Sequence, residues 1–352
     1  MPDPSLNPDG WPTGTMPALS FTAPHELTWA QADIPGPMSG EVLVRVEFLG
    51  ICGTDIHLFT GQSAYIRDGL TSFPFRPGHE FTGVVVAAAD DVVEVAVGDR
   101  VVGEPFLPCG HCRICRRGDL HLCPHRSELG VRGTAPGAAA RYVRIPQQNL
   151  AVVPDTVPAE HALLAEPAVT VLHSLAATRL QPGQRVAVIG SGTIGLLATQ
   201  VASAAGAQVD TIGVDAGLAL ALEAGAMHTF APDEAPSDVY DIVIEASGAA
   251  SALSLAIRIA AIGGAISQTG IPGRDSTGVR ASEFVTKGLR LVGVLGGIPY
   301  LARAVGLIAS GVIRPAQLIG SIRPWGDAAQ ALADLTAGGL ARPKILLDLR
   351  DL

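Results

Sequence analysis

Charged residues are scarce in this chain. Asp, Glu, Lys and Arg make up 16% of its 352 residues, whereas hydrophobic residues make up 48%. Disordered chains show the opposite balance, so this composition indicates a soluble globular protein with a large buried fraction. Because a chain of this length exceeds what one hydrophobic core usually fills, we expect two domains.

An excess of positive charge is also missing. The chain has 24 Lys and Arg against 33 Asp and Glu, a net charge of −9. Proteins that bind nucleic acid usually carry a basic stripe for the phosphate backbone. The one basic cluster, Arg113, Arg116 and Arg117, lies between cysteines and is interpreted as a solvated loop. We therefore expect no nucleic-acid partner.

Neither a secretory signal nor a membrane span is recognisable. Residues 1–16 have no basic segment and no apolar run, and we expect a disordered leader there. Residues 186–209 are uncharged and long enough to cross a bilayer, but Gly190, Gly192 and Gly195 interrupt them. A buried strand, a tight turn and a packed helix fit them better. We expect a cytoplasmic protein with no membrane partner and reduced thiols.

Cysteine is rare, and four of the five cysteines fall within fifteen residues. Cys109, Cys112 and Cys115 follow one another at two-residue spacings, and Cys123 comes after seven more residues. Four thiolates at these spacings can surround Zn²⁺ as a tetrahedron, whereas a reducing compartment disfavours disulfides. Because four protein ligands leave no open position, we expect a structural zinc in a lobe of about residues 104–126.

A second group of metal-ligand residues includes the fifth cysteine. Cys52 follows residues 41–48, whose alternation of apolar and polar residues predicts a strand, and His79 and Glu80 precede a β-branched run. Cysteine, histidine and carboxylate are ligands of catalytic zinc sites that keep one position for water or substrate. A lone cysteine is more often a core residue, so the prediction rests on the joint pattern.

This joint pattern resembles the zinc-dependent medium-chain dehydrogenase family, in the alcohol and polyol branch with sorbitol and threonine dehydrogenases. The resemblance runs from about residue 17 to the C-terminus and rests on Cys-Gly-Thr-Asp-x-His, Gly-His-Glu and the four-cysteine lobe. It implies that Cys52 and His79 bind a catalytic zinc, with Glu80 or Glu166 as the third ligand. The Glu-Pro that begins at Glu166 is similar to the polyol enzymes. We expect a small polar hydroxylated substrate.

The same resemblance gives roles to residues that follow Cys52. Asp55 would orient His79 and raise its basicity, unless it merely caps the following turn. Thr54 and His57 are similar to the family's proton relay, in which the threonine hydroxyl touches the substrate oxygen and the histidine passes the proton outward. Either one could instead be a surface turn residue.

The substrate itself remains open among polyols, sugars, amino alcohols and cyclitols. The loop of residues 60–77 would border the pocket and holds Tyr65, Arg67 and Asp68. These polar groups suit a hydroxyl-rich partner, or they are ordinary surface residues.

The cofactor site is predicted from a glycine motif. A β-branched run ends at Gly190, Gly192 and Gly195 follow at the spacing of a dinucleotide-binding turn, and an alanine-rich helix comes next. The first glycine permits the tight turn, the second lets the backbone approach a pyrophosphate, and the third allows close helix packing. Thr193 and Ile194 lie inside this turn. A glycine-rich turn without a ligand is the alternative.

Further strands are expected at residues 208–214, 238–248 and 263–271, separated by helices in a parallel series. Ser247, Gly248 and Gly270 lie at strand ends, where such sheets bind ligands, and are candidate cofactor contacts. NAD enzymes usually end the second strand with an acid, but counting places Ile212 or Gly213 there.

Asp215 would serve only if that strand ran two or three residues longer, and no Lys or Arg follows nearby to bind a 2′-phosphate. The expected cofactors are therefore two zinc ions per chain and NAD or NADP.

The resemblance implies an α/β architecture in two domains. A GroES-like β-rich catalytic domain would comprise residues 17–160 and 297–352, and a Rossmann doubly wound parallel-sheet cofactor domain residues 161–296. In this family the strand at residues 289–295 commonly pairs across a dimer axis, so we expect a homodimer or homotetramer.

The predicted activity is the interconversion of a secondary alcohol and its ketone by hydride transfer. A zinc-independent reductase of the same superfamily is one alternative, and the set of Cys52, His79 and Glu80 argues against it. A non-catalytic dinucleotide-binding protein is another, because a fold alone does not imply a function.

Overall fold

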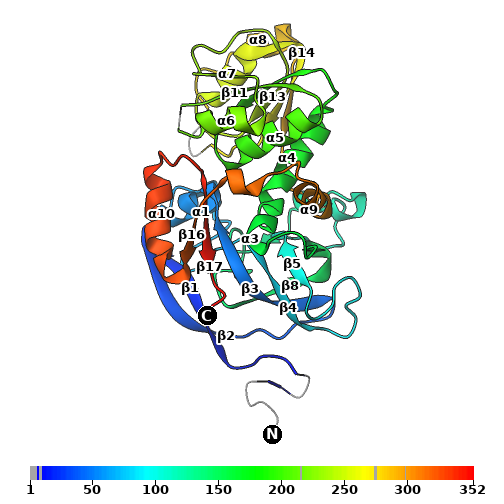
Figure 1. Ribbon diagram of the computed structural model, residues 1–352, viewed down its shortest axis with the longest axis vertical. Helices are drawn as coiled ribbons and strands as arrows, with labels where there is room; N and C mark the ends of the chain where they lie inside the picture. Colours follow the sequence, from blue (N-terminus) through cyan, green and yellow to red (C-terminus); the bar gives the residue numbers. More distant parts are fainter. Residues whose placement is uncertain (1–5, 8–9, 215, 273–275, 298) are drawn as a thin grey trace.

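The computed structural model describes residues 6–7, 10–214, 216–272, 276–297 and 299–352. The chain forms two halves, each built around its own sheet, with the cofactor half above the β-rich half in Figure 1. This arrangement confirms the predicted fold class. Both chain ends belong to the β-rich half, so the cofactor half is inserted into it.

The β-rich half contains a seven-stranded sheet in which the last strands of the chain pair with the first. Six strands follow the order β16-β17-β3-β4-β5-β9, and β8 pairs with β3. A two-stranded sheet of β1 and β2 lies beside it. The bounds are β1 Thr15–Ala23, β2 Glu26–Asp33, β3 Glu41–Ile51, β4 Glu80–Ala88, β5 Arg100–Gly103, β8 Tyr142–Pro146, β9 Leu150–Val152, β16 Ile319–Pro324 and β17 Lys344–Asp348.

The cofactor half is a doubly wound parallel sheet. Its six strands follow the order β12-β11-β10-β13-β14-β15, and every neighbouring pair is parallel. β-Branched and apolar residues dominate the central strands because helices bury them on both faces. The bounds are β10 Arg185–Ile189, β11 Gln208–Ile212, β12 His228–Phe230, β13 Tyr240–Glu245, β14 Ala260–Gln268 and β15 Arg290–Gly293.

The helices cover the sheets and connect the halves. They are α1 Gly53–Phe59, α2 Ala64–Arg67, α3 Ala159–Ala162, α4 Ala165–Thr178, α5 Thr193–Ala204, α6 Leu218–Ala224, α7 Ala252–Ile259, α8 Ala281–Thr286, α9 Leu301–Ala309 and α10 Ala328–Ala337. Short 3₁₀ turns occupy η1 Cys115–Arg117, η2 Leu120–Leu122, η3 Gln147–Asn149, η4 Pro315–Gln317 and η5 Trp325–Asp327.

One hydrophobic core extends through both halves, and α4 lies in its middle. Phe48 and Val102 of the β-rich half share this core with Val186 and Val188 of β10. Between them lie Ala165, Ala168, Val169, Val171, Leu172 and Leu175 of α4. The two halves are therefore packed together through α4 and are not merely tethered.

Two details differ from the sequence expectation. Thr15 and Met16 already belong to β1, so the predicted leader of residues 1–16 is too long at its end; residues 1–5 and 8–9 lie outside the described residues. The strand expected at residues 208–214 stops at Ile212, because the chain turns at Gly213, which packs against the Ser191 side chain.

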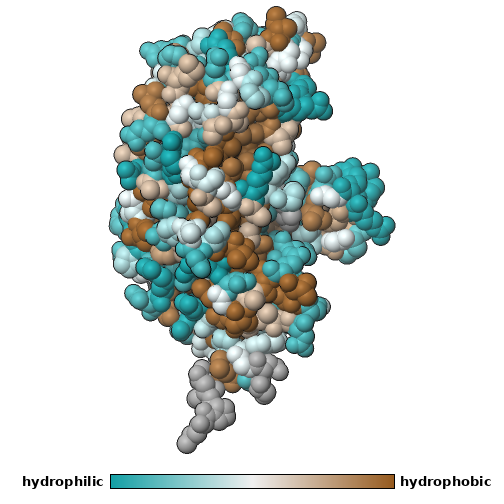
Figure 2. Space-filling model, turned by 45° about the vertical axis from the view of Figure 1, so that its right-hand side comes forward, coloured by the Kyte–Doolittle hydropathy of each residue, from teal (hydrophilic) through white to brown (hydrophobic). Residues whose placement is uncertain are grey.

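The surface in Figure 2 is a mixture of polar and apolar residues, with apolar residues gathered along the middle of the face shown. Across the part of the chain that the structure describes, none of the helices combines the length and the apolar character that crossing a bilayer requires.

The third glycine of the cofactor motif allows the first turn of α5 to lie against the end of β10. A Cβ atom at Gly195 would overlap the carbonyl oxygen of Gly190. Gly190 itself has φ of 106° and packs on Ser247, so its backbone cannot easily shift to make room for that Cβ atom.

Gly195→Ala is therefore expected to lower the free energy of unfolding by about 2 kcal/mol, measured by chemical denaturation. Gly306→Ala is the matched control, because Gly306 lies inside α9 with nothing within 4 Å of an added Cβ. The control should raise stability by about 1 kcal/mol. Equal stability of the two variants would contradict the close packing at Gly195.

Candidate active site and structural metal centre

A cavity of about 390 Å³ is lined by residues of both halves. Most of the site residues predicted from the sequence line this cavity. From the β-rich half come Cys52, Thr54, His57, His79 and Glu80, and from the cofactor half Glu166, Gly192, Thr193, Ile194, Ser247, Gly248 and Gly270. Tyr65 lines it too, whereas the exposed pair of Arg67 and Asp68 does not.

Cys52 is positioned by the start of α1. It is the N-cap residue, and its backbone N–H donates to Asp55 Oδ2 at 2.9 Å. The other carboxylate oxygen of Asp55 faces His79 Nδ1 at 3.4 Å, with both side chains buried. Asp55 therefore caps the turn and also lies against His79.

The residues around Cys52 fit a metal ion. One donor atom each of Cys52, His79 and Glu80 lie within 4.8 Å of one another. Burial opposes a charge on His79, yet Asp55 and Cys52 raise its pKa well above the usual value. A thiol, an imidazole whose other nitrogen faces a carboxylate, and a carboxylate are the donor set of a catalytic zinc site.

The Glu80 side chain contacts Lys344, a residue that the sequence analysis did not predict to belong to the site. Both side chains are 1% exposed and form an ion pair, and Lys344 Nζ also donates to Ile51 O at 3.1 Å. Burial lowers the pKa of Lys344, but Glu80 and Cys52 reverse this, and the net shift is upward. The available signal was a lysine at the start of an apolar strand, which alone does not reveal its partner.

Glu166 reaches the cavity from the first turn of α4. Burial and the neighbouring Glu80 carboxylate raise its pKa to about 8. Glu104, also missed by the sequence analysis, is 2% exposed, and burial raises its pKa to about 8 as well. Glu80 and Glu166 therefore both line the cavity, and Glu104 lies close enough to Glu166 to raise its pKa further, an arrangement that a bound cation stabilises.

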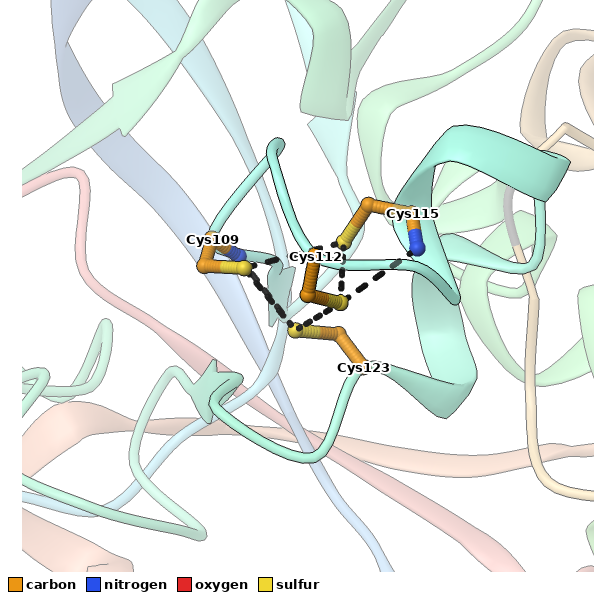
Figure 3. Close-up of side chains that lie close together, drawn as sticks. All are labelled: Cys109, Cys112, Cys115 and Cys123. Carbon is orange, nitrogen blue, oxygen red and sulfur yellow. Dashed lines mark hydrogen bonds between the residues drawn. The ribbon is translucent and has the colours of Figure 1, made fainter.

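The four cysteines of the lobe form a second centre, shown in Figure 3. Their Sγ atoms are 3.5 Å apart in the pairs Cys109–Cys123 and Cys112–Cys115, 3.8 Å in Cys112–Cys123 and 3.9 Å in Cys109–Cys115. A tetrahedron with Zn–S bonds of about 2.3 Å has sulfur atoms about 3.8 Å apart. All four are free thiols, as expected for metal ligands.

Backbone amides prepare this centre for thiolates. The N–H of Cys115 donates to Cys112 Sγ at 3.4 Å, and that of Cys109 to Cys123 Sγ at 3.5 Å. The amides of His111 and Cys112 lower the pKa of the Cys109 thiol to about 6. The set of four thiols therefore fits a structural zinc.

The lobe is closed at its base by a short strand pair. β6, Phe106–Leu107, pairs antiparallel with β7, Ser127–Glu128, just outside the four cysteines. Phe106 and Glu128 both line the active-site cavity. The lobe therefore fixes one wall of that cavity.

The cofactor loops are organised by Glu245, the last residue of β13. This buried carboxylate accepts the Ser247 N–H at 2.7 Å, the Ser247 hydroxyl at 2.6 Å and the Gly248 N–H at 2.9 Å, and its other oxygen accepts from Gln268. Gly192, the N-cap of α5, has nothing within 4 Å of an added Cβ, so its backbone is open to a ligand.

The acid that NAD enzymes usually carry at the end of the second strand does not stand at the end of β11. β11 ends at Ile212, and Asp215 lies outside the described residues. Gly213 follows the strand and faces Ser191.

Family models and known proteins agree with this geometry. Residues 38–155 match the alcohol dehydrogenase GroES-like domain, and residues 193–310 match the zinc-binding dehydrogenase domain. An L-threonine 3-dehydrogenase of Chelativorans sp. (strain BNC1) is 37% identical over 300 residues, which are 81% of this chain and 85% of the relative. The chain belongs to the zinc-dependent medium-chain dehydrogenase family.

Two further members of the family show its range. A sorbitol dehydrogenase of Bacillus subtilis (strain 168) is 30% identical over 84% of this dehydrogenase and 86% of its own length. A protein of Sinorhizobium meliloti 1021, described as a zinc-binding dehydrogenase and solved bound to NADP, has a TM-score of 0.86 and 29% identity, covering 95% of this chain and 99% of its own. Family membership favours an enzyme over the alternatives of a zinc-independent reductase and a non-catalytic protein.

Cys112→Ser is expected to reduce the zinc content from two ions per chain to one, measured by elemental analysis of the purified protein. The midpoint of thermal unfolding should fall by roughly 5 °C or more, because an incomplete site no longer stabilises the lobe. Cys52→Ser serves as the comparison, since it should also leave one ion. A Cys112→Ser protein that retains two ions would disprove the assignment of the lobe.

Glu245→Gln should weaken dinucleotide binding roughly 10-fold, because three hydrogen bonds to a charged acceptor become hydrogen bonds to a neutral one. Fluorescence titration with NADH and NADPH measures this effect. Asp241→Asn, on the same strand, is the control: its exposed carboxylate accepts the Arg185 N–H at 2.9 Å. Unchanged affinity in the Glu245 variant would show that this carboxylate does not organise the cofactor loops.

Proposed function

We propose that this dehydrogenase oxidises a secondary hydroxyl group of a small polyol, or reduces the matching ketone, in the cavity between its two halves. The observation that carries the proposal is the convergence of Cys52, His79 and Glu80 in the cavity that the cofactor loops also line. Threonine, sorbitol and NADP appear in the names of relatives and are extended to this chain only as classes of ligand.

Cys52, His79 and Glu80 hold the catalytic zinc in this proposal, with Glu166 beside them. Glu80 is preferred over Glu166 as the third ligand because it belongs to the close group of donor atoms. Lys344 occupies one oxygen of Glu80 and leaves the other available. When bound, zinc supplies a Lewis acid that lowers the pKa of a hydroxyl group.

The protein's own groups then handle the proton and the orientation of the substrate. Thr54, half-buried in the cavity, accepts the hydroxyl proton, and the exposed His57 passes it to solvent. Asp55 keeps the His79 ring in place through the contact with its Nδ1.

Gly192, Thr193 and Ile194 at the N-terminus of α5, and Ser247, Gly248 and Gly270 at the neighbouring strand ends, would hold the cofactor. Gly190 and Gly195 provide the turn and the packing beneath it. A bound nicotinamide would supply the hydride acceptor for the carbinol carbon. We propose NAD or NADP without choosing between them.

We also propose a cytoplasmic homo-oligomer, either a dimer or a tetramer. β15 is the last strand of the cofactor sheet among the described residues, and Leu291 on it is 42% exposed. An unpaired strand edge with exposed apolar residues is a ready surface for a second copy.

Cys52→Ala should lower kcat for alcohol oxidation at least about 10⁴-fold, because the metal loses a ligand at the reacting centre. Dinucleotide binding and thermal stability should stay close to those of the native protein. The assay follows NADH or NADPH absorbance with sorbitol, L-threonine and cyclitols, each with both cofactors. Substantial turnover by rigorously metal-free protein would refute the proposal.

A further inference from the structure

Glu128 is a buried carboxylate in the wall of the active-site cavity that none of the steps above uses. It lies at the end of β7 and is 3% exposed. Its Oε1 accepts the Arg126 Nε–H at 2.7 Å, and its Oε2 lies 3.3 Å from the Tyr65 hydroxyl. A carboxylate oxygen has two acceptor positions, so each oxygen can accept one more hydrogen bond.

The lobe holds Arg126 in place behind this carboxylate. Arg126 Nη1 donates to the carbonyl of the ligand residue Cys123 at 3.2 Å, and the guanidinium lies 5.8 Å from the centre of the Phe106 ring. Arg126 does not line the cavity. The positive charge of Arg126 therefore pairs with Glu128, and the guanidinium does not face a substrate in the cavity.

The other carboxyl groups of the cavity are Glu166, which its raised pKa of about 8 leaves mostly protonated near neutral pH, and Glu80, which is paired. Glu80, Glu128 and Glu166 all line the cavity, whereas Lys344 is the one lysine or arginine among the described lining residues. The positive charge of Lys344 is already paired with Glu80. A carboxylate or phosphate placed beside Glu128, on the wall away from the metal-ligand residues, would meet that carboxylate without an unpaired lysine or arginine among the described lining residues, and burying such a charge unpaired is costly.

We propose that Glu128 selects the substrate, accepting a hydrogen bond from a hydroxyl group remote from the reacting carbinol and repelling substrates that carry an anion. The selected class is therefore neutral polyols, in preference to amino acids and polyol phosphates. Tyr65 completes this contact: burial and Glu128 raise its pKa to about 12, so its hydroxyl remains a donor. This inference rests on the proposed function, because it concerns the same cavity.

Two variants separate the hydrogen bond from the charge. Glu128→Gln keeps an acceptor of the same shape and removes the negative charge, whereas Glu128→Ala removes both. The substrates are sorbitol, galactitol 1-phosphate and L-threonine, assayed with zinc-loaded enzyme and NAD⁺ or NADP⁺. Calorimetric titration of the same compounds into the enzyme–NADH or enzyme–NADPH complex gives binding constants that do not depend on turnover.

The native enzyme should prefer sorbitol over galactitol 1-phosphate and L-threonine by at least about 100-fold in kcat/KM. Glu128→Gln should reduce this preference roughly 10-fold with little change in the KM for sorbitol. Glu128→Ala should raise the KM for sorbitol roughly 10-fold with little change in kcat, since a contact common to ground and transition states is lost.

Glu47→Gln is the matched control for the loss of a buried carboxylate. Glu47 is 8% exposed, pairs with Arg100 Nε at 3.1 Å and does not line the cavity. Glu47→Gln should change thermal stability about as much as Glu128→Gln does, without changing substrate preference. If Glu128→Ala does not fold, the substrate preference measured for Glu128→Gln is sufficient to test the inference.

A native preference for L-threonine or galactitol 1-phosphate would overturn this inference and leave the proposed dehydrogenase intact. An unchanged preference in Glu128→Gln would do the same. Absence of turnover with every alcohol and both cofactors would overturn the proposed function and this inference with it.

Discussion

The buried ion pair between Lys344 and Glu80 is the contact on which the catalytic half depends. It joins β17, one of the last strands of the chain, to β4, which begins directly after His79, and it lies under the strand that leads to Cys52. Two charges at 1% exposure are stable only when they satisfy each other, because either one left alone would be buried without a partner. The C-terminal strand β17 therefore contributes the partner of a candidate metal ligand, Glu80.

The sequence predicted the parts of the site that depend on short-range spacing. The four cysteines, the glycine turn and the series from Cys52 to Glu80 are local patterns whose chemistry requires particular residues at particular distances along the chain. The parallel sheet was expected from the strands and helices around the glycine turn, whereas the GroES-like half was expected only from the family resemblance.

The residues that escaped prediction act through tertiary contacts. Lys344, Glu104, Glu128 and Glu245 are each unremarkable in their own segments and acquire a role only from partners far away in the chain or from complete burial. The length of β11 was also overestimated, since the strand ends at Ile212 and Gly213, beside the Ser191 side chain, follows it. Charge balance in a cavity is likewise a property of the folded chain.

The segments that connect the two halves are themselves part of the cavity wall. The first connection contributes Glu166, Pro167 and Thr170, and the return connection contributes Val294, Leu295 and Gly296. His173 fastens one connection to the other, with Nδ1 at 3.0 Å from Leu295 O and 2.9 Å from Gly296 O. Whatever fills the cavity therefore contacts both covalent connections between the halves at once, so the candidate site and the junction of the two halves share one wall.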